Sequence, residues 1–165
     1  MSNFNSRLTA DELRRTVRYN PDTGAFTWIA PVRGVTTGQP CGYVRASGYR
    51  TIMFGKTNYA AHRLAWLYVY GEWPRTFVDH INGVRDDNRI ANLREATKSQ
   101  NGENQRRAKS GSSSGLLGAH PHGSGFRSSI VQNGVTIRLG TFRTAEEAHH
   151  AYLSAKRALH GHCTI

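Results

Sequence analysis

The chain has 165 residues, and its 22 lysines and arginines outnumber its 11 aspartates and glutamates, so the formal net charge is +11 at pH 7. A balance this basic favours a polyanionic partner, because neutralising phosphates releases condensed counterions. Nucleic acid is the first expectation, and an acidic membrane surface or a merely soluble surface are the alternatives. No apolar run is long enough to span a bilayer, and the first residues lack a secretory pattern, so neither a membrane protein nor a secreted one is expected.

The two cysteines, Cys41 and Cys163, lie far apart and outside any CxxC pattern. We therefore expect no disulfide framework and no cysteine-based zinc site, and a reducing cytoplasm fits this usage.

The N-terminal part begins with a short helix, for which Thr9 and Glu12 form a capping box. A turn at 19–24 follows, and then short strands are expected near 25–29, 42–45, 49–54 and 57–59. The segment 60–70, which reads AAHRLAWLYVY, predicts a helix that Gly71 and Pro74 end.

The centre of the chain predicts a strand at 77–80, a long polar loop at 81–91, a strand at 93–96 and a helix capped by Thr97. The segment 105–115 is basic and then rich in Ser and Gly, which is typical of a linker.

Beyond the linker, a strand is expected at 116–120 and a turn at 121–125. The strands 126–132 and 135–142 are joined by Asn133-Gly134, a strong hairpin signal. Thr144 and Glu147 cap a final helix. The predicted fold class is α+β, divided into an N-terminal extension (1–45), a central domain (46–104), the linker (105–115) and a C-terminal domain (116–165).

The central loop carries the residues most suited to chemistry. Asp79 and His80 end one strand, and Asn92 and Asn101 follow. Carboxylate and amide oxygens suit a hard divalent cation, and an imidazole can take a proton from water at neutral pH. In a strongly basic chain, this combination indicates hydrolysis of a phosphodiester.

These residues resemble the HNH nuclease motif, and the wider pattern AHRLAW…VDHING…DNRIANLREAT…QN over about 49–104 resembles the homing-endonuclease branch of that family. The resemblance implies a ββα-metal fold carried by a bacteriophage enzyme in the bacterial cytoplasm. It implies that Asp79 and Asn101 bind one Mg²⁺ or Mn²⁺, that His80 is the general base, and that Asn92 holds the loop. No zinc and no organic cofactor are expected.

Side chains alternate along a strand, so Asp79 and His80 converge only if the backbone bends at His80, as the family implies. Asn82 and Asn88 are interpreted as loop-shaping residues, and His62 as a packed or DNA-facing residue. Three nearby arginines either contact phosphate or brace Asp86 and Asp87, and the sequence leaves both alternatives open. These arginines are Arg63, Arg89 and Arg94.

A two-residue turn pairs Ser129 with Arg138, Ser128 with Leu139 and Arg127 with Gly140. One face of the hairpin is then apolar and packs on the last helix, and the other is cationic. Double-stranded DNA is its expected partner, through Arg127, Ser129, Thr136 and Arg138.

The segment from about 115 to 160, with RLGTF and TAEEAHHAY, resembles an AP2 DNA-binding domain, which implies a three-stranded antiparallel sheet packed on one helix. Phe126 stands where that family often has tryptophan. Backbone contacts to DNA are expected from Arg106, Arg107, Lys109 and Arg94.

The sequence thus predicts a metal-dependent DNA endonuclease with a tethered DNA-binding sheet. A non-catalytic DNA-binding regulator on a nuclease-derived scaffold is the alternative, and an RNA-directed protein is a further one. Target site, nicking or double-strand cleavage, and oligomeric state stay open.

Overall fold

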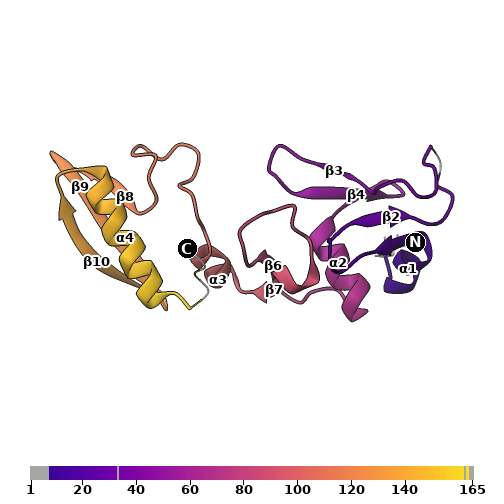
Figure 1. Ribbon diagram of the computed structural model, residues 1–165. Coiled ribbons are helices and arrows are strands. Elements are labelled where there is room, and N and C mark those ends of the chain that lie inside the picture. Colours follow the sequence, from indigo (N-terminus) through magenta and orange to yellow (C-terminus); the bar gives the residue numbers. More distant parts are fainter. Residues whose placement is uncertain (1–7, 33, 162, 164–165) are drawn as a thin grey trace, which may run out of the picture. The chain divides into compact units, whose positions relative to one another are not determined.

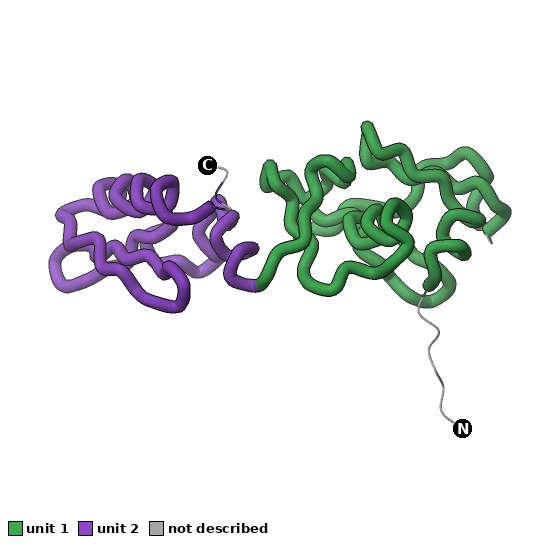
Figure 2. Tube along the Cα trace, turned by 90° about the horizontal axis from the view of Figure 1, so that it is seen from below, with its two compact units in different colours: residues 1–97 green, residues 98–165 purple. Residues whose placement is uncertain are grey.

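The computed structural model describes residues 8–32, 34–161 and 163. The chain forms two compact units, Met1–Thr97 and Lys98–Ile165, which Figure 2 distinguishes by colour. The division falls before the expected linker 105–115, and the expected division between 45 and 46 is absent. Both differences arise from packing between segments far apart in sequence, which local patterns do not report.

Unit 1 is a mixture of short strands and helices (Figure 1). Its helices are α1 (Ala10–Thr16) and α2 (Ala61–Tyr70), with a short 3₁₀ turn, η1 (Ile90–Asn92). Its strands are β1 (Val17–Tyr19), β2 (Phe26–Trp28), β3 (Tyr43–Val44), β4 (Arg50–Phe54), β5 (Thr57–Ala60), β6 (Phe77–His80) and β7 (Leu93–Ala96). They pair as β1–β2, β3–β4–β5 and β6–β7, all antiparallel.

Local signals explain where the helices of unit 1 begin and end. The capping box is present, since Thr9 accepts from the Glu12 N–H while Glu12 accepts from the Thr9 N–H. Gly71 ends α2 in the left-handed region at φ 80°, where glycine carries no steric penalty, and its N–H donates to the Leu67 carbonyl.

One hydrophobic core joins the N-terminal segment to the rest of unit 1. Leu13, Val17 and Phe26 pack in the same cluster as Ile52 and Leu64, and all five are almost completely buried. Residues 8–45 therefore share their core with the following segment and are part of one unit with it.

Unit 2 contains α3 (Lys98–Glu103), β8 (Ala119–His122), β9 (Gly125–Gln132), β10 (Val135–Phe142) and α4 (Ala145–Leu159). The three strands form an antiparallel sheet in the order β10–β9–β8, and α4 crosses one face of it (Figure 1). The second capping box, at Thr144 and Glu147, is present as predicted. The turn expected at 121–125 is shorter, because Pro121 and His122 continue β8.

Packing in unit 2 depends on two positions. Gly118 lies at φ 76°, and a Cβ there would stand 2.0 Å from the Tyr152 ring, so only glycine permits this approach. Lys156 falls beside the predicted apolar stripe of α4 and is completely buried. Its ammonium group donates to the Gln105 carbonyl and lies 5.7 Å from the Tyr152 ring centroid, which satisfies a charge that would otherwise be costly to bury.

The hairpin register was predicted correctly only as far as Arg138. Ser129 pairs with Arg138, but the next pair is Ser128 with Gly140, because Leu139 is a bulge residue. Gly140 lies at φ 140°, a region open to glycine, which accounts for the irregularity at this place. As a result Thr141, and not Gly140, stands opposite Arg127.

Within the described part of the chain, every helix is too short or too polar to span a membrane.

Candidate active site

The β6–β7 ladder fixes the directions of Asp79 and His80. Asp79 pairs with Arg94 and His80 pairs with Leu93, and the register is regular through both pairs. Since side chains alternate along a regular strand, Asp79 and His80 point to opposite faces of the ladder. The bend at His80 that the family resemblance implied is absent from this pairing.

His80 lies in a nearly dry environment. Its side chain is 3% exposed, and the Tyr49 and His62 rings lie 5.8 and 5.0 Å from it, centroid to centroid. The His80 Nε2 atom is 3.3 Å from the Asn88 Oδ1 atom. Because an amide oxygen can only accept, this contact places a proton on Nε2 and the basic lone pair on Nδ1.

Burial lowers the pKa of His80 below its ordinary value, and the contact with Asn88 opposes that shift. The imidazole is therefore neutral at neutral pH. A neutral imidazole with a fixed tautomer is the form that can accept a proton from water.

The Asp79 carboxylate forms a salt bridge with Arg94. Its Oδ2 atom accepts from Arg94 Nη2 at 3.0 Å and Nε at 3.3 Å, and the carboxylate is largely buried. Arg94, expected to contact DNA, is thus held against the carboxylate expected to bind the metal. In the structure its role is to offset the charge of Asp79.

The other arginines of the region brace the loop carboxylates or the backbone. Arg50 forms a two-point pair with Asp86 at 2.8 and 2.9 Å, and Arg89 forms one with Asp87 at 2.7 and 2.6 Å. Arg63 donates to the Thr76 carbonyl at 3.3 Å. For Arg89, the structure thus favours the bracing reading of the two that the sequence left open.

Asn92 closes the polar loop at its base. Its Oδ1 atom accepts from the Asn82 N–H at 3.0 Å, and its Nδ2 atom donates to the Asp87 carbonyl at 2.8 Å. Asn82 in turn donates to the Asp87 carboxylate at 2.6 Å and accepts from the Val84 N–H at 2.9 Å. These contacts fit the loop-holding role expected of Asn92 and the loop-shaping role of Asn82.

Asn88 is a site residue whose role the sequence reading missed. It is 1% exposed, and besides its contact with His80 it donates from Nδ2 to the Asp86 carbonyl at 3.0 Å. An asparagine in a turn-rich loop gives no sign of which long-range partner it meets. The sequence feature that could have indicated a role for Asn88 is its position between Asp87 and Arg89 in the polar loop.

The N-terminal segment contacts the same loop at Asn88 and Arg89. The Tyr19 hydroxyl donates to the Asn88 carbonyl at 2.7 Å, and Gly24 approaches so closely that a Cβ would stand 2.5 Å from the Arg89 nitrogen. Residues 8–45, to which the sequence assigned no chemistry, therefore position the residue that contacts His80.

His62 packs against His80, as its packed reading expected, with the two ring centroids 5.0 Å apart. Its Nδ1 atom is buried and has no hydrogen-bond partner among the described residues. Burial, with smaller effects from His80 and Arg63, lowers the pKa of His62 to about 3, so it stays uncharged.

Asn101, the expected second metal ligand, lies in α3 of unit 2 and is exposed. Among the residues that the structure describes, no three His, Cys, Asp or Glu side chains gather into a metal cluster. A cation bound here would therefore need amide or backbone oxygens as well as a carboxylate. Of the two ligands expected from the sequence, Asp79 belongs to unit 1 and Asn101 to unit 2.

The sheet of unit 2 presents a polar face away from α4. Cross-strand pairing places His120 opposite Arg127 and Ser129 opposite Arg138, and these partners share one face. The bulge adds Thr141 to the same face. The four residues predicted to contact bases therefore share this face: Arg127, Ser129, Thr136 and Arg138. His120 and Thr141, which were not predicted, lie on the same face.

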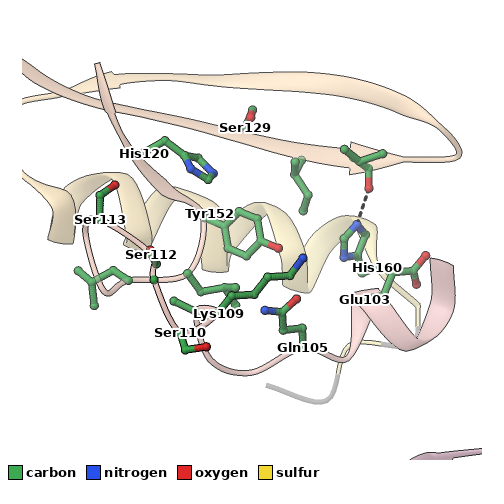
Figure 3. Close-up of a pocket in the computed structure, with 18 of the residues that line it drawn as sticks. Glu103, Gln105, Lys109, Ser110, Ser112, Ser113, His120, Ser129, Tyr152 and His160 are labelled. Carbon is green, nitrogen blue, oxygen red and sulfur yellow. Dashed lines mark hydrogen bonds between the residues drawn. The ribbon is translucent and has the colours of Figure 1, made fainter. Parts of the chain in front are cut away.

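A hollow of about 810 Å³ lies within unit 2, between the 99–118 segment and the sheet (Figure 3). Lys109, His120 and Ser129 line it, together with Tyr152 of α4. At its edge, His160 Nε2 donates to the Val131 carbonyl at 2.9 Å. Lys109 of the predicted linker is among the hollow's lining residues. Arg106 and Arg107, the other predicted linker contacts, are exposed.

Comparison with known proteins bears on the centre of the chain. Residues 59–103 match the family model of HNH endonucleases. The HNH segment spans α2, β6, the polar loop, β7 and α3, and so includes Asp79, His80, Asn88, Asn92 and Asn101. The match supports a nuclease that acts on DNA. No curated protein and no solved structure matches the chain significantly.

Proposed function

We propose that this protein is a metal-dependent DNA endonuclease of the phage homing type, which hydrolyses phosphodiester bonds with one metal ion and is targeted by the sheet of unit 2. The observation that carries the proposal is His80. A neutral, buried imidazole with a fixed tautomer stands at the end of β6, inside the segment that matches the HNH endonucleases.

In this proposal His80 accepts a proton from the attacking water at Nδ1. The Asn88 carboxamide keeps the ring oriented by accepting from Nε2, and Asn92 keeps the polar loop closed around them. Orientation of this kind matters because a general base must lie within hydrogen-bond reach of the proton it takes.

Asp79 and Asn101 are the proposed ligands of one Mg²⁺ or Mn²⁺. Because Asp79 and His80 point to opposite faces of the ladder in this structure, the proposal requires the end of β6 to bend when metal and DNA bind, so that both side chains reach the same phosphate. When bound, the cation would offset the charge that develops at phosphorus and on the leaving oxygen. Arg94 already holds one oxygen of Asp79, so it would keep that carboxylate fixed in direction.

The polar face of unit 2 is proposed to bind duplex DNA in the manner of an AP2-like domain. It carries Arg127 and Arg138 with neighbouring hydroxyl groups, and arginine is the commonest reader of guanine in the major groove. Tethering such a face to a nuclease raises the local concentration of DNA at the cleavage site.

One observation favours a second candidate, a DNA-binding regulator that does not cut. The Arg94–Asp79 pair at 3.0 Å already offsets the charge of the only acidic residue among the proposed ligands. In a non-catalytic protein this pair would be a purely structural contact.

Incubation of supercoiled plasmid with the full-length protein separates the two candidates. The endonuclease nicks or linearises the plasmid with Mg²⁺ and not with EDTA, while His80→Ala retains DNA binding and loses cleavage. His150→Ala is the matched control, because His150 is exposed on α4, outside the HNH segment. A wild-type protein that binds the plasmid but never cuts it would leave the regulator as the better description.

A further inference from the structure

Three arginines of the polar loop and the strands beside it are paired with carboxylates. Arg50 pairs with Asp86, Arg89 with Asp87 and Arg94 with Asp79, at 2.8, 2.6 and 3.0 Å. Each of these guanidinium groups therefore has its charge offset within the protein. Another arginine of the loop, Arg85, differs from them.

Arg85 has no carboxylate partner among the residues that the structure describes, although Asp86 and Asp87 follow it directly in the chain. Those two carboxylates are turned to Arg50 and Arg89. The two carboxylates next to Arg85 in the sequence are therefore paired with other arginines in the fold. The charge of Arg85, at the surface, is not offset by either of them.

The Arg85 side chain is nevertheless held in place. Its Nη1 atom donates to the Ser47 carbonyl at 2.7 Å, and its guanidinium carbon lies 5.0 Å from the centroid of the Tyr49 ring. A stacked, hydrogen-bonded guanidinium loses little further freedom when it binds a ligand. Only one of its N–H groups has a hydrogen-bond acceptor within the described structure, and Arg85 is exposed, so the other donors are open to an anion.

The position of Arg85 relates it to His80 through one aromatic ring. Tyr49 stacks under the Arg85 guanidinium, and the same ring lies 5.8 Å from the His80 ring. An anion bound by Arg85 would thus lie near His80, the proposed general base, because both side chains contact the Tyr49 ring. A planar guanidinium binds phosphate, as it binds carboxylate, through two parallel N–H donors.

We propose that Arg85 binds the phosphate of the DNA strand at the cleavage site and stabilises its additional negative charge during hydrolysis. Arg85 neither gives nor takes a proton. The attacking water gives a proton to His80 and forms the new P–O bond as the P–O bond to the leaving oxygen breaks, and the leaving oxygen takes a proton from a second, solvent water. This assignment rests on the proposed nuclease function.

The test compares four full-length proteins: wild type, Arg85→Ala, Arg85→Lys and Arg18→Ala. Arg18 is exposed on β1, so its loss removes the same charge at a place assigned no role. Single-turnover cleavage of supercoiled plasmid is measured with Mg²⁺ at saturating protein, with and without methylguanidinium. Duplex binding is measured in EDTA across a salt series, and melting temperatures are recorded for each protein.

We expect Arg85→Ala to cut about 10²–10³-fold more slowly, the usual loss when one donor to a developing oxyanion is removed. Methylguanidinium restores part of that rate, and Arg85→Lys is intermediate because it keeps the charge without the planar fork. The slope of log affinity against log salt falls by about 0.9, as for one lost phosphate contact. Arg18→Ala cuts at the wild-type rate.

The outcomes separate this proposal from the function on which it rests. If the wild type cuts and Arg85→Ala cuts equally fast, the Arg85 assignment is overturned and the nuclease stands. A slow Arg85→Ala protein that methylguanidinium does not rescue, with an equally slow Arg85→Lys, shows a structural role and also overturns it. If the wild type does not cut, the nuclease proposal fails, and the salt slope alone decides whether Arg85 contacts phosphate.

Discussion

Asn88 connects the folding of the polar loop to the proposed chemistry, and Asn88→Ala tests that connection. The substitution removes the carboxamide that lies 3.3 Å from His80 Nε2 and donates to the Asp86 carbonyl at 3.0 Å. A net contribution of about 0.5–1.5 kcal/mol for each hydrogen bond gives a loss of about 1–3 kcal/mol in the free energy of unfolding. Cleavage falls further, by about 10²-fold, because the His80 ring loses the partner that fixes its direction.

Asn82→Ala is the matched control for this experiment. Asn82 is in the same loop, and its side chain makes two hydrogen bonds: it donates to the Asp87 carboxylate at 2.6 Å and accepts from the Val84 N–H at 2.9 Å. Neither bond involves His80. We therefore expect Asn82→Ala to lose a similar amount of stability and to keep most of its cleavage rate.

Unfolding in urea is followed by tryptophan fluorescence, which reports unit 1 alone because Trp28, Trp66 and Trp73 are the three tryptophans of the chain. Cleavage is measured under single turnover at a temperature where both variants are folded. Equal cleavage rates for Asn88→Ala and Asn82→Ala, at equal stability, would refute the claim that Asn88 acts through His80.

Three further predictions concern unit 1 and use the same fluorescence assay. Tyr19→Phe loses the 2.7 Å bond to the Asn88 carbonyl and about 1 kcal/mol of stability; an unchanged urea midpoint would contradict this. Gly24→Ala places a Cβ 2.5 Å from the Arg89 nitrogen at φ 73°, so it destabilises unit 1 more than Gly55→Ala, which has a positive φ but nothing within 4 Å. The pKa of His62 is about 3 in the folded chain and 6.5 ordinarily. Between pH 3 and pH 6.5, the unfolded chain therefore binds a proton at His62 that the folded chain does not bind. Stability therefore falls as the pH decreases below about 6.5, by at most about 1.4 kcal/mol per pH unit, and His62→Phe flattens this part of the curve; an identical slope in both proteins would exclude His62 as its cause.

Features set by neighbouring residues could be predicted from the sequence. Both capping boxes form where Ser/Thr and Glu have the required spacing, at Thr9 and Thr144. The Asn133-Gly134 turn takes positive φ at both positions, as a two-residue hairpin requires. In each case the determining contacts lie within a few residues of one another.

Contacts between distant segments were not accessible in the same way. The Tyr19–Asn88 bond joins residues 69 positions apart, and it makes the N-terminal segment part of the candidate site. Lys156 was not expected in a buried position, because a lysine is rarely buried without a partner, and its partner Gln105 lies 51 positions away. The same limitation applies to Arg85, whose lack of a carboxylate depends on where Arg50 and Arg89 are brought by the fold.

The bulge at Leu139 shows how one local irregularity changes a functional surface. A regular hairpin places Gly140 opposite Arg127, which leaves a bare backbone beside that arginine. The shifted register replaces it with Thr141, whose exposed side chain brings a hydroxyl group to the polar face. A hydroxyl can both donate to and accept from a base edge or a phosphate. Because the shift depends on Gly140 at φ 140°, this glycine determines which side chains the sheet presents, although it offers no side chain of its own.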